Sequence, residues 1–407
     1  IGFLFKRKGY RYIKMLSHKF LLDIAIILLS TKLLGLITKK FNMPQVVGAL
    51  LAGVVLGPAM LNILHETEFI QQLASLGVIV LMFTAGLETN IKELKKTGKA
   101  SALVALLGVI VPLVGGFIVA YIFNKQDVSN VNQNHLLQNI FIGVIITATS
   151  VSITVETLKE IGKLNTRAGN TILGAALIDD ILGVIALTII TSMADSSVKI
   201  GIVLLKILLF FIFSSAIGYL FYICFIKWIR RYHKDMRRFV IISFVFCLLL
   251  SFTAEELFGV ADITRAFIAG LIISNTERTK YINSKFETLS YILLSPIFFA
   301  SIGIKVELSN MSMHILLFTV VLTIVALLSK IYGCALGARM CGYDKYESLE
   351  VGIGMISRGE VALIVANKGI AVGLMKSTFL APVIIVVTFT TIITPILLKI
   401  ICKKSTV

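Results

Sequence analysis

The sequence predicts an all-α integral membrane protein of about thirteen transmembrane helices. Of its 407 residues, 57% are hydrophobic and only 15% are charged, which is too little charge to cover the surface of a soluble domain. The apolar residues form blocks of roughly 17–25, the length of helix that spans a bilayer. Two of these blocks contain polar residues and glycines at their centres, a pattern that predicts helices broken inside the membrane.

The connecting loops are too short to hold an extra domain, so residues 20–404 are expected to form a single membrane transport unit without a soluble regulatory domain. Residues 1–19 precede it as an N-terminal segment. Met15 stands directly before the first span, so residues 1–14 are interpreted as an extension ahead of the natural start; a genuine basic tail is the alternative. The spans are expected at residues 20–37, 44–62, 69–87, 100–123, 136–158, 166–193, 200–226, 238–257, 262–275, 285–304, 313–338, 347–371 and 377–400.

The loops between the spans alternate between many and few basic residues. One set, together with the C-terminal tail, carries 23 Lys and Arg, and the opposite internal loops carry 5. Basic residues concentrate in cytoplasmic loops. This predicts a multi-pass plasma-membrane protein with its C-terminus in the cytoplasm and its N-terminus outside, although the basic residues within 1–19 disagree. The same loops explain the net charge of +17, so no nucleic-acid partner is expected.

The cysteines and histidines predict neither a disulfide framework nor a resident cofactor. The five cysteines form no C-x-x-C pair, and the five histidines are scattered without metal-ligand spacing.

Two adjacent carboxylates, Asp179 and Asp180, lie in the middle of the sixth span. One ionised Asp at the centre of a membrane helix costs about 2.5–3.5 kcal/mol unless water, a cation or a basic group compensates it. Consecutive helical residues point about 100° apart, so one carboxylate can face a cavity while the other faces another helix. An intramembrane aspartyl protease needs two aspartates that approach from two helices, so no enzyme activity is expected. A position at the membrane edge, or a role in packing alone, is the structural alternative.

Lys330, within the eleventh span, is the expected charged partner for this pair, and snorkelling to the interface is its alternative. The fifth span carries hydroxyl groups from Thr147 to Thr154, and the twelfth carries Ser357, Arg358 and Glu360 beside glycines. Irregular backbone at membrane depth is tolerated only where it is buried or lines a cavity. Arg358 and Glu360 are expected either to hold the broken helix ends or to take part in ion binding.

Other charged residues near the span ends are expected to be solvated interface residues. They are Asp23, Glu255, Glu256, Asp262 and Arg265.

The motifs of this sequence, taken together in their order along the chain, resemble those of the bacterial Kef-type and NapA-type monovalent cation/proton antiporters over nearly the whole chain. The resemblance implies an NhaA-like antiporter fold: thirteen helices in inverted repeats, two broken crossover helices, a dimerisation domain, a core ion-binding domain (about 100–193 and 313–371), and a homodimer in the lipid bilayer. The matching stretches are Pro44–Gly48, Gly53–Pro58, Thr149–Val151, Ile178–Asp180, Ala266–Gly270, Pro296–Phe299, Lys330 and Ser357–Glu360.

The resemblance also implies roles for the site residues. Asp180 becomes the carboxylate for which cation and protons compete, and Asp179 pairs with Lys330. Thr149 and Ser150 lie at the first crossover, beside Na⁺ held at Asp180, and Arg358 and Glu360 lie on the second. The implied function is exchange of Na⁺, or of Li⁺ or K⁺, for protons by alternating access.

Two carboxylates and a titratable lysine favour electrogenic exchange, with electroneutral exchange as the alternative. Kef-type members carry Gln-Asp in place of Asp179-Asp180 and end in a nucleotide-binding domain, so the chain departs from them. A Kef-like K⁺ efflux or K⁺/proton system is the second hypothesis, and a sodium-coupled uptake carrier for organic anions is the third.

Overall fold

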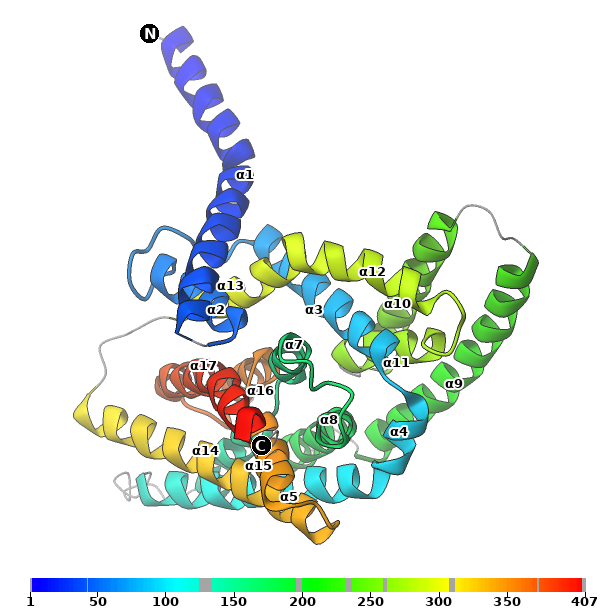
Figure 1. The fold of residues 1–407 in the computed structure, drawn as a ribbon. Coiled ribbons are helices and arrows are strands. Elements are labelled where there is room, and N and C mark those ends of the chain that lie inside the picture. The colour runs from blue at the N-terminus through cyan, green and yellow to red at the C-terminus, as the bar shows by residue number, and fades with distance from the viewer. Residues whose placement is uncertain are drawn as a thin grey trace.

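The computed structural model consists of helices joined by loops (Figure 1). It describes residues 2–41, 43–123, 134–194, 200–231, 236–258, 262–306, 312–371 and 373–404. No strand occurs in these residues, and nine helical stretches among them are long and apolar enough to cross a membrane. The predicted all-α membrane class is therefore confirmed, whereas the count of thirteen helices stays a prediction.

The helices form two groups according to how they pack, and in Figure 1 the first group arcs over the second. The scaffold group consists of α1 (Gly2–Lys40), α2 (Gln45–Leu56), α3 (Glu68–Glu88), α9 (Ile200–Arg231), α10 (Arg237–Phe258), α11 (Asp262–Ile273), α12 (Thr279–Leu289), the π-helical turn η2 (Ser290–Leu294) and α13 (Ser295–Ile304). The core group consists of α5 (Gly98–Phe123), α6 (Asn134–Thr147), α7 (Val151–Glu160), α8 (Arg167–Ala194), α14 (Met313–Met340), α15 (Lys345–Gly354), α16 (Glu360–Ala371), the short turn η3 (Ser377–Phe379) and α17 (Leu380–Lys404). The short α4 (Ile91–Lys96) connects the two groups.

The core group contains the same order of elements twice. A long helix, a broken helix and a second long helix follow one another as α5, α6–α7 and α8, and again as α14, α15–α16 and α17. The two leading helices, α5 and α14, pack against each other, and each also packs against the broken helix and the long helix that follow it. Both broken helices are therefore held by the same central pair.

Local sequence determines several helix ends. The Thr67 hydroxyl accepts the Ile70 N–H at the start of α3, and Asp344 and Glu347 form a capping box at the start of α15. α2 ends at Leu56, earlier than the predicted limit of residue 62, because Gly57-Pro58 follows and proline cannot continue the helical hydrogen bonds.

Glycines bring scaffold helices into backbone contact. A Cβ atom on Gly86 of α3 would lie 2.2 Å from the carbonyl oxygen of Phe267, and one on Gly270 of α11 would lie 2.2 Å from that of Phe83. Only glycine fits at both positions, as is usual where membrane helices cross closely. The α3–α11 contact is therefore a tightly packed part of the scaffold group.

Candidate functional site

The helix predicted for the fifth span is broken among its hydroxyl-bearing residues. α6 ends at Thr147, α7 begins at Val151, and residues 148–150 between them are not helical. Thr149 and Ser150 are 4% and 3% exposed. Because the helix is interrupted, the last carbonyls of α6 and the first N–H groups of α7 have no hydrogen-bond partners within their own helices. Other groups have to provide those hydrogen bonds.

The helix predicted for the twelfth span is broken as well. α15 ends at Gly354, α16 begins at Glu360, and residues 355–359 between them are buried and not helical. The position of both breaks agrees with the sequence prediction.

The two breaks meet and exchange hydrogen bonds. The Ser150 N–H donates to the carbonyl of Ser357 at 2.7 Å, and the Ser357 hydroxyl donates to the carbonyl of Ser150. The Thr154 hydroxyl donates to the Gly354 carbonyl at 2.7 Å, which satisfies the end of α15. A Cβ atom on Gly359 would lie 2.6 Å from the Ser150 Oγ atom, so a glycine is needed for this close approach.

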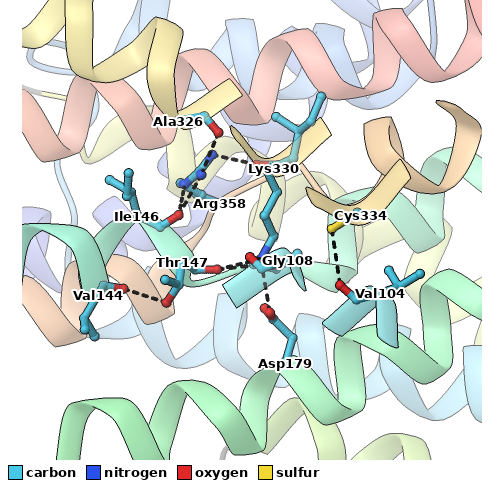
Figure 2. A network of polar contacts seen from close by, with 12 residues as sticks. Val104, Gly108, Val144, Ile146, Thr147, Asp179, Ala326, Lys330, Cys334 and Arg358 are labelled. Carbon is cyan, nitrogen blue, oxygen red and sulfur yellow. Dashed lines mark hydrogen bonds and ion pairs between the residues drawn. The ribbon is translucent and has the colours of Figure 1, made fainter. Parts of the chain in front are cut away.

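Lys330 is fully buried between the two halves of the core group (Figure 2). Its ammonium group donates to Asp179 Oδ1 at 3.1 Å, to the Thr147 carbonyl at 2.7 Å and to the Gly108 carbonyl at 2.8 Å. All three N–H bonds thus have an acceptor. The side chain does not snorkel; it joins α14 to α8, α6 and α5.

Arg358, which is 1% exposed, binds the broken helix ends (Figure 2). Its Nε and Nη2 atoms donate to the carbonyl of Ile146, in the last turn of α6, at 3.0 and 2.6 Å. Nη2 also donates to the Ala326 carbonyl and Nη1 to the Ile356 carbonyl, both at 3.0 Å. This geometry agrees with the alternative in which Arg358 holds the helix ends. The side chain of Glu360 lies outside the described residues.

The two adjacent aspartates have different surroundings. Asp179 is 3% exposed and is bound to Lys330, whereas Asp180, the next residue on α8, is partly exposed. Because Lys330 binds both Asp179 and the Thr147 carbonyl, Asp179 lies near the first break.

Residues 25–404 match the family described as sodium/hydrogen exchanger, transmembrane. The chain belongs to this family. The resemblance to monovalent cation/proton antiporters, predicted from the motifs, is thereby confirmed.

Two relatives of the sodium/hydrogen exchanger family align over almost the whole chain. The Na⁺/H⁺-K⁺ antiporter GerN of Bacillus cereus is 39% identical over 385 residues, which cover 94% of this chain and 96% of that protein. The Na⁺/H⁺ antiporter of Enterococcus hirae is 37% identical over 392 residues, covering 94% and 97%. The solved sodium proton antiporter MjNhaP1 of Methanocaldococcus jannaschii shares the fold, with a TM-score of 0.63 and 20% identity over 92% of this chain and 95% of that one.

Sequence reasoning missed one part of this candidate site, the glycine that lets α14 pack closely against α5 beside Lys330. A Cβ atom on Gly108 would lie 2.7 Å from Cys334 Sγ and 3.6 Å from Lys330 Nζ. A glycine inside an otherwise apolar span was the only available signal, and apolar membrane helices contain many glycines for packing alone.

The prediction that Arg265 and Asp23 are solvated interface residues is wrong. Arg265 is 1% exposed and its guanidinium donates to the carbonyl of Ser251, and Asp23 is 7% exposed. Position along a span indicates depth in the membrane, but it does not indicate which side of the helix faces other helices. The side chains of Glu255, Glu256 and Asp262 lie outside the described residues.

Proposed function

We propose that the protein is a secondary active antiporter that exchanges a monovalent cation, principally Na⁺, for protons. The observation that supports this proposal is the unequal pair of carboxylates beside two crossing broken helices. Asp179 is compensated by Lys330, while Asp180 remains partly exposed. A partly exposed carboxylate inside a membrane helix is suited to bind either a proton or a cation.

In this proposal, cation and proton compete for Asp180. A protonated carboxyl has no negative charge to hold Na⁺, and a bound Na⁺ displaces the proton. Thr149 and Ser150 supply hydroxyl oxygens at the first crossover. Arg358 holds the helix ends together at the second crossover, where Glu360 begins α16.

The repeated order of elements in the core group supports alternating access. We assign α5–α8 and α14–α17 to two inverted repeats of an NhaA-like fold, in which the core group carries the ion and moves against the scaffold group. The scaffold group then serves as the dimerisation domain of a homodimer.

The hydrogen bonds of Lys330 support an electrogenic cycle. The ammonium has three N–H bonds, and its acceptors are one carboxylate and two carbonyls. If Na⁺ binding draws Asp179 away from Lys330, the ammonium group can lose the proton that pointed at Asp179. The neutral amine keeps two N–H bonds, which donate to the Gly108 and Thr147 carbonyls. Lys330 then releases one proton and Asp180 another, so two protons exchange for one Na⁺. A fixed Lys330, with one proton exchanged per cation, is the alternative.

K⁺/proton exchange is the second candidate. The relative GerN is named a Na⁺/H⁺-K⁺ antiporter and aligns over 94% of this chain, which favours testing K⁺ beside Na⁺ and Li⁺.

We further propose that the protein lies in the plasma membrane with its C-terminus in the cytoplasm, because 23 Lys and Arg occupy one set of loops and the tail, against 5 on the opposite side.

Transport in proteoliposomes with an internal pH dye tests the function. An outward proton gradient is imposed, and Na⁺, Li⁺ or K⁺ is then added outside. Antiport predicts that each transported cation changes the internal pH and that a labelled cation accumulates against its own gradient. Movement that only ever follows the cation gradient would indicate a channel instead.

A further inference from the structure

The last turn of α7 joins the core group to the scaffold group through a pair of charges. Lys159 Nζ lies 3.0 Å from Glu88 Oε1, at the end of α3, and 3.3 Å from the Thr84 hydroxyl. The same Glu88 oxygen accepts the Asn283 amide of α12 at 2.8 Å. One core lysine therefore binds a polar group made by two scaffold helices.

The next residue, Glu160, binds a third scaffold helix. Its two carboxylate oxygens accept the N–H of Gln45, the first residue of α2, at 2.8 and 3.1 Å. α2 is preceded by Pro44, whose side chain cannot cap a helix, whereas Thr67 and Asn90 cap the starts of α3 and α4. The start of α2 thus obtains its cap from the core group, and a carboxylate is also favoured at the positive end of a helix.

The pair of charges is more than an ordinary surface contact. The side chains of Lys159 and Glu88 are 14% and 23% exposed, whereas Lys96 and Glu93, which pair within α4, are 70% and 45% exposed. Solvent and salt weaken the attraction between two charges less when the charges are shielded from water. Among the described residues, α7 contacts both α2 and α3, and the other main contacts between the two groups are those of α17 with α2 and of α8 with α9.

We propose that the last turn of α7 is a clamp, made of Lys159 and Glu160 with Glu88, Asn283 and the N–H of Gln45, that locks the core group against the scaffold group in the conformation described here. The clamp must open whenever the core group moves. This inference rests on the proposed function only for its place in the transport cycle, because the locked contact itself is a property of the fold.

Pulsed electron spin resonance on the purified whole protein tests the clamp. Spin labels are attached at Asn165, after α7, and at Ser284, on α12, which are both exposed. Cys224 and Cys341 are changed to Ser to prevent stray labelling. Glu88→Gln or Lys159→Gln should raise the population with a longer distance between the labels by about two- to fivefold, as expected for loss of one ion pair.

A charge exchange makes the test sharper. Thr84 and Asn283 can each donate or accept a hydrogen bond, so the double variant Glu88→Lys/Lys159→Glu should bring the distances back toward those of the wild type. Glu66→Gln is the matched control: it breaks the pair with Lys305, 3.1 Å apart and 33% and 27% exposed, inside the scaffold group. It should leave the distances unchanged.

Distances that stay at wild-type values in both single variants would overturn the clamp, even if the variants melt at a lower temperature, because that combination describes a merely stabilising contact. An equal change in Glu66→Gln would overturn it too. Failure of the proposed function would appear in a separate experiment. The wild-type protein would then show no cation/proton exchange in liposomes, while the variants would still show the longer distances between the labels.

Discussion

Lys330 and Arg358 donate to neighbouring carbonyl groups in the last turn of α6, Lys330 to Thr147 and Arg358 to Ile146. Both cations come from the second half of the chain, whereas α6 belongs to the first. The carboxyl end of a helix carries partial negative charge, which nearby cations stabilise. Because these two carbonyls already accept hydrogen bonds from Lys330 and Arg358, we expect the transported ion to find its ligands at Asp180 and at the hydroxyl groups of the break.

Asp180→Asn should abolish cation/proton exchange while the protein remains folded. Asn keeps the volume of Asp but can neither titrate nor supply a negative charge. Exchange is measured in proteoliposomes, and folding by gel filtration. Asp23→Asn is the control, since Asp23 is another carboxylate in an apolar helix but is buried in the scaffold group; it should retain exchange. Near wild-type exchange by Asp180→Asn would remove Asp180 from the mechanism.

An imposed membrane potential should shift the Na⁺/H⁺ equilibrium if Lys330 releases a proton in each cycle. Each net charge moved contributes about 2.3 kcal/mol per 100 mV. The potential is set with K⁺ and valinomycin, and the internal pH at equilibrium is measured. If that pH does not depend on the potential, exchange is electroneutral and Lys330 is a fixed structural partner of Asp179.

Arg358→Lys should destabilise the protein although the charge is kept. A lysine ammonium is a compact point charge and cannot span the three carbonyls of Ile146, Ala326 and Ile356 that the guanidinium reaches. Each buried carbonyl left without a donor costs about 1–3 kcal/mol. The thermal midpoint in detergent should fall by several degrees. Arg339→Lys, at an exposed position with one carbonyl partner, should change it much less.

Gly108→Ala should impair folding or exchange, and Cys334→Ala should relieve part of the defect. The new methyl group would lie 2.7 Å from Cys334 Sγ, so α5 and α14 would have to separate near Lys330. Removing the sulfur atom makes room for the methyl group. Thermal midpoints of the two single variants and the double variant measure this coupling; additive effects would show that the two positions do not compete for space.

A cysteine placed at Arg231 should resist a membrane-impermeant thiol reagent added to intact cells, because the basic loop after α9 is predicted to be cytoplasmic. A cysteine at Met313, which is 79% exposed at the start of α14, is predicted to lie outside and should react. The opposite pattern would reverse the proposed orientation.

The sequence allowed the location of both helix breaks to be predicted, because hydroxyl groups and glycines clustered inside an apolar span weaken the helix at that point. It also suggested that Lys330 pairs with the two adjacent aspartates, since buried charges of opposite sign need partners; that Asp179 is the one bound was implied only by the family resemblance. What Arg358 binds could not be predicted. Its acceptors are three backbone carbonyls, and backbone groups are present at every position, so the sequence carries no sign of which ones are left unpaired.

Burial of individual charges was predicted less well. Arg265 and Lys330 are both fully buried, yet only Lys330 lies deep enough in its span for hydropathy to suggest it. The clamp at Lys159 and Glu160 was also missed, because its partners at residues 45, 88 and 283 come from three separate helices, and contact between such distant segments depends on how the two groups pack.

The contact between the two breaks also sets the order of events during biosynthesis. The carbonyl of Ile146 receives its guanidinium partner from a residue 212 positions later, and the Thr147 carbonyl waits 183 positions for Lys330. At translation rates of about 5–20 residues per second, roughly 10–40 seconds separate synthesis of the first break from synthesis of Arg358. Over that interval these two carbonyls cannot yet have the partners that they have in the folded protein, and the contact between the two breaks forms only after the twelfth predicted span has left the ribosome.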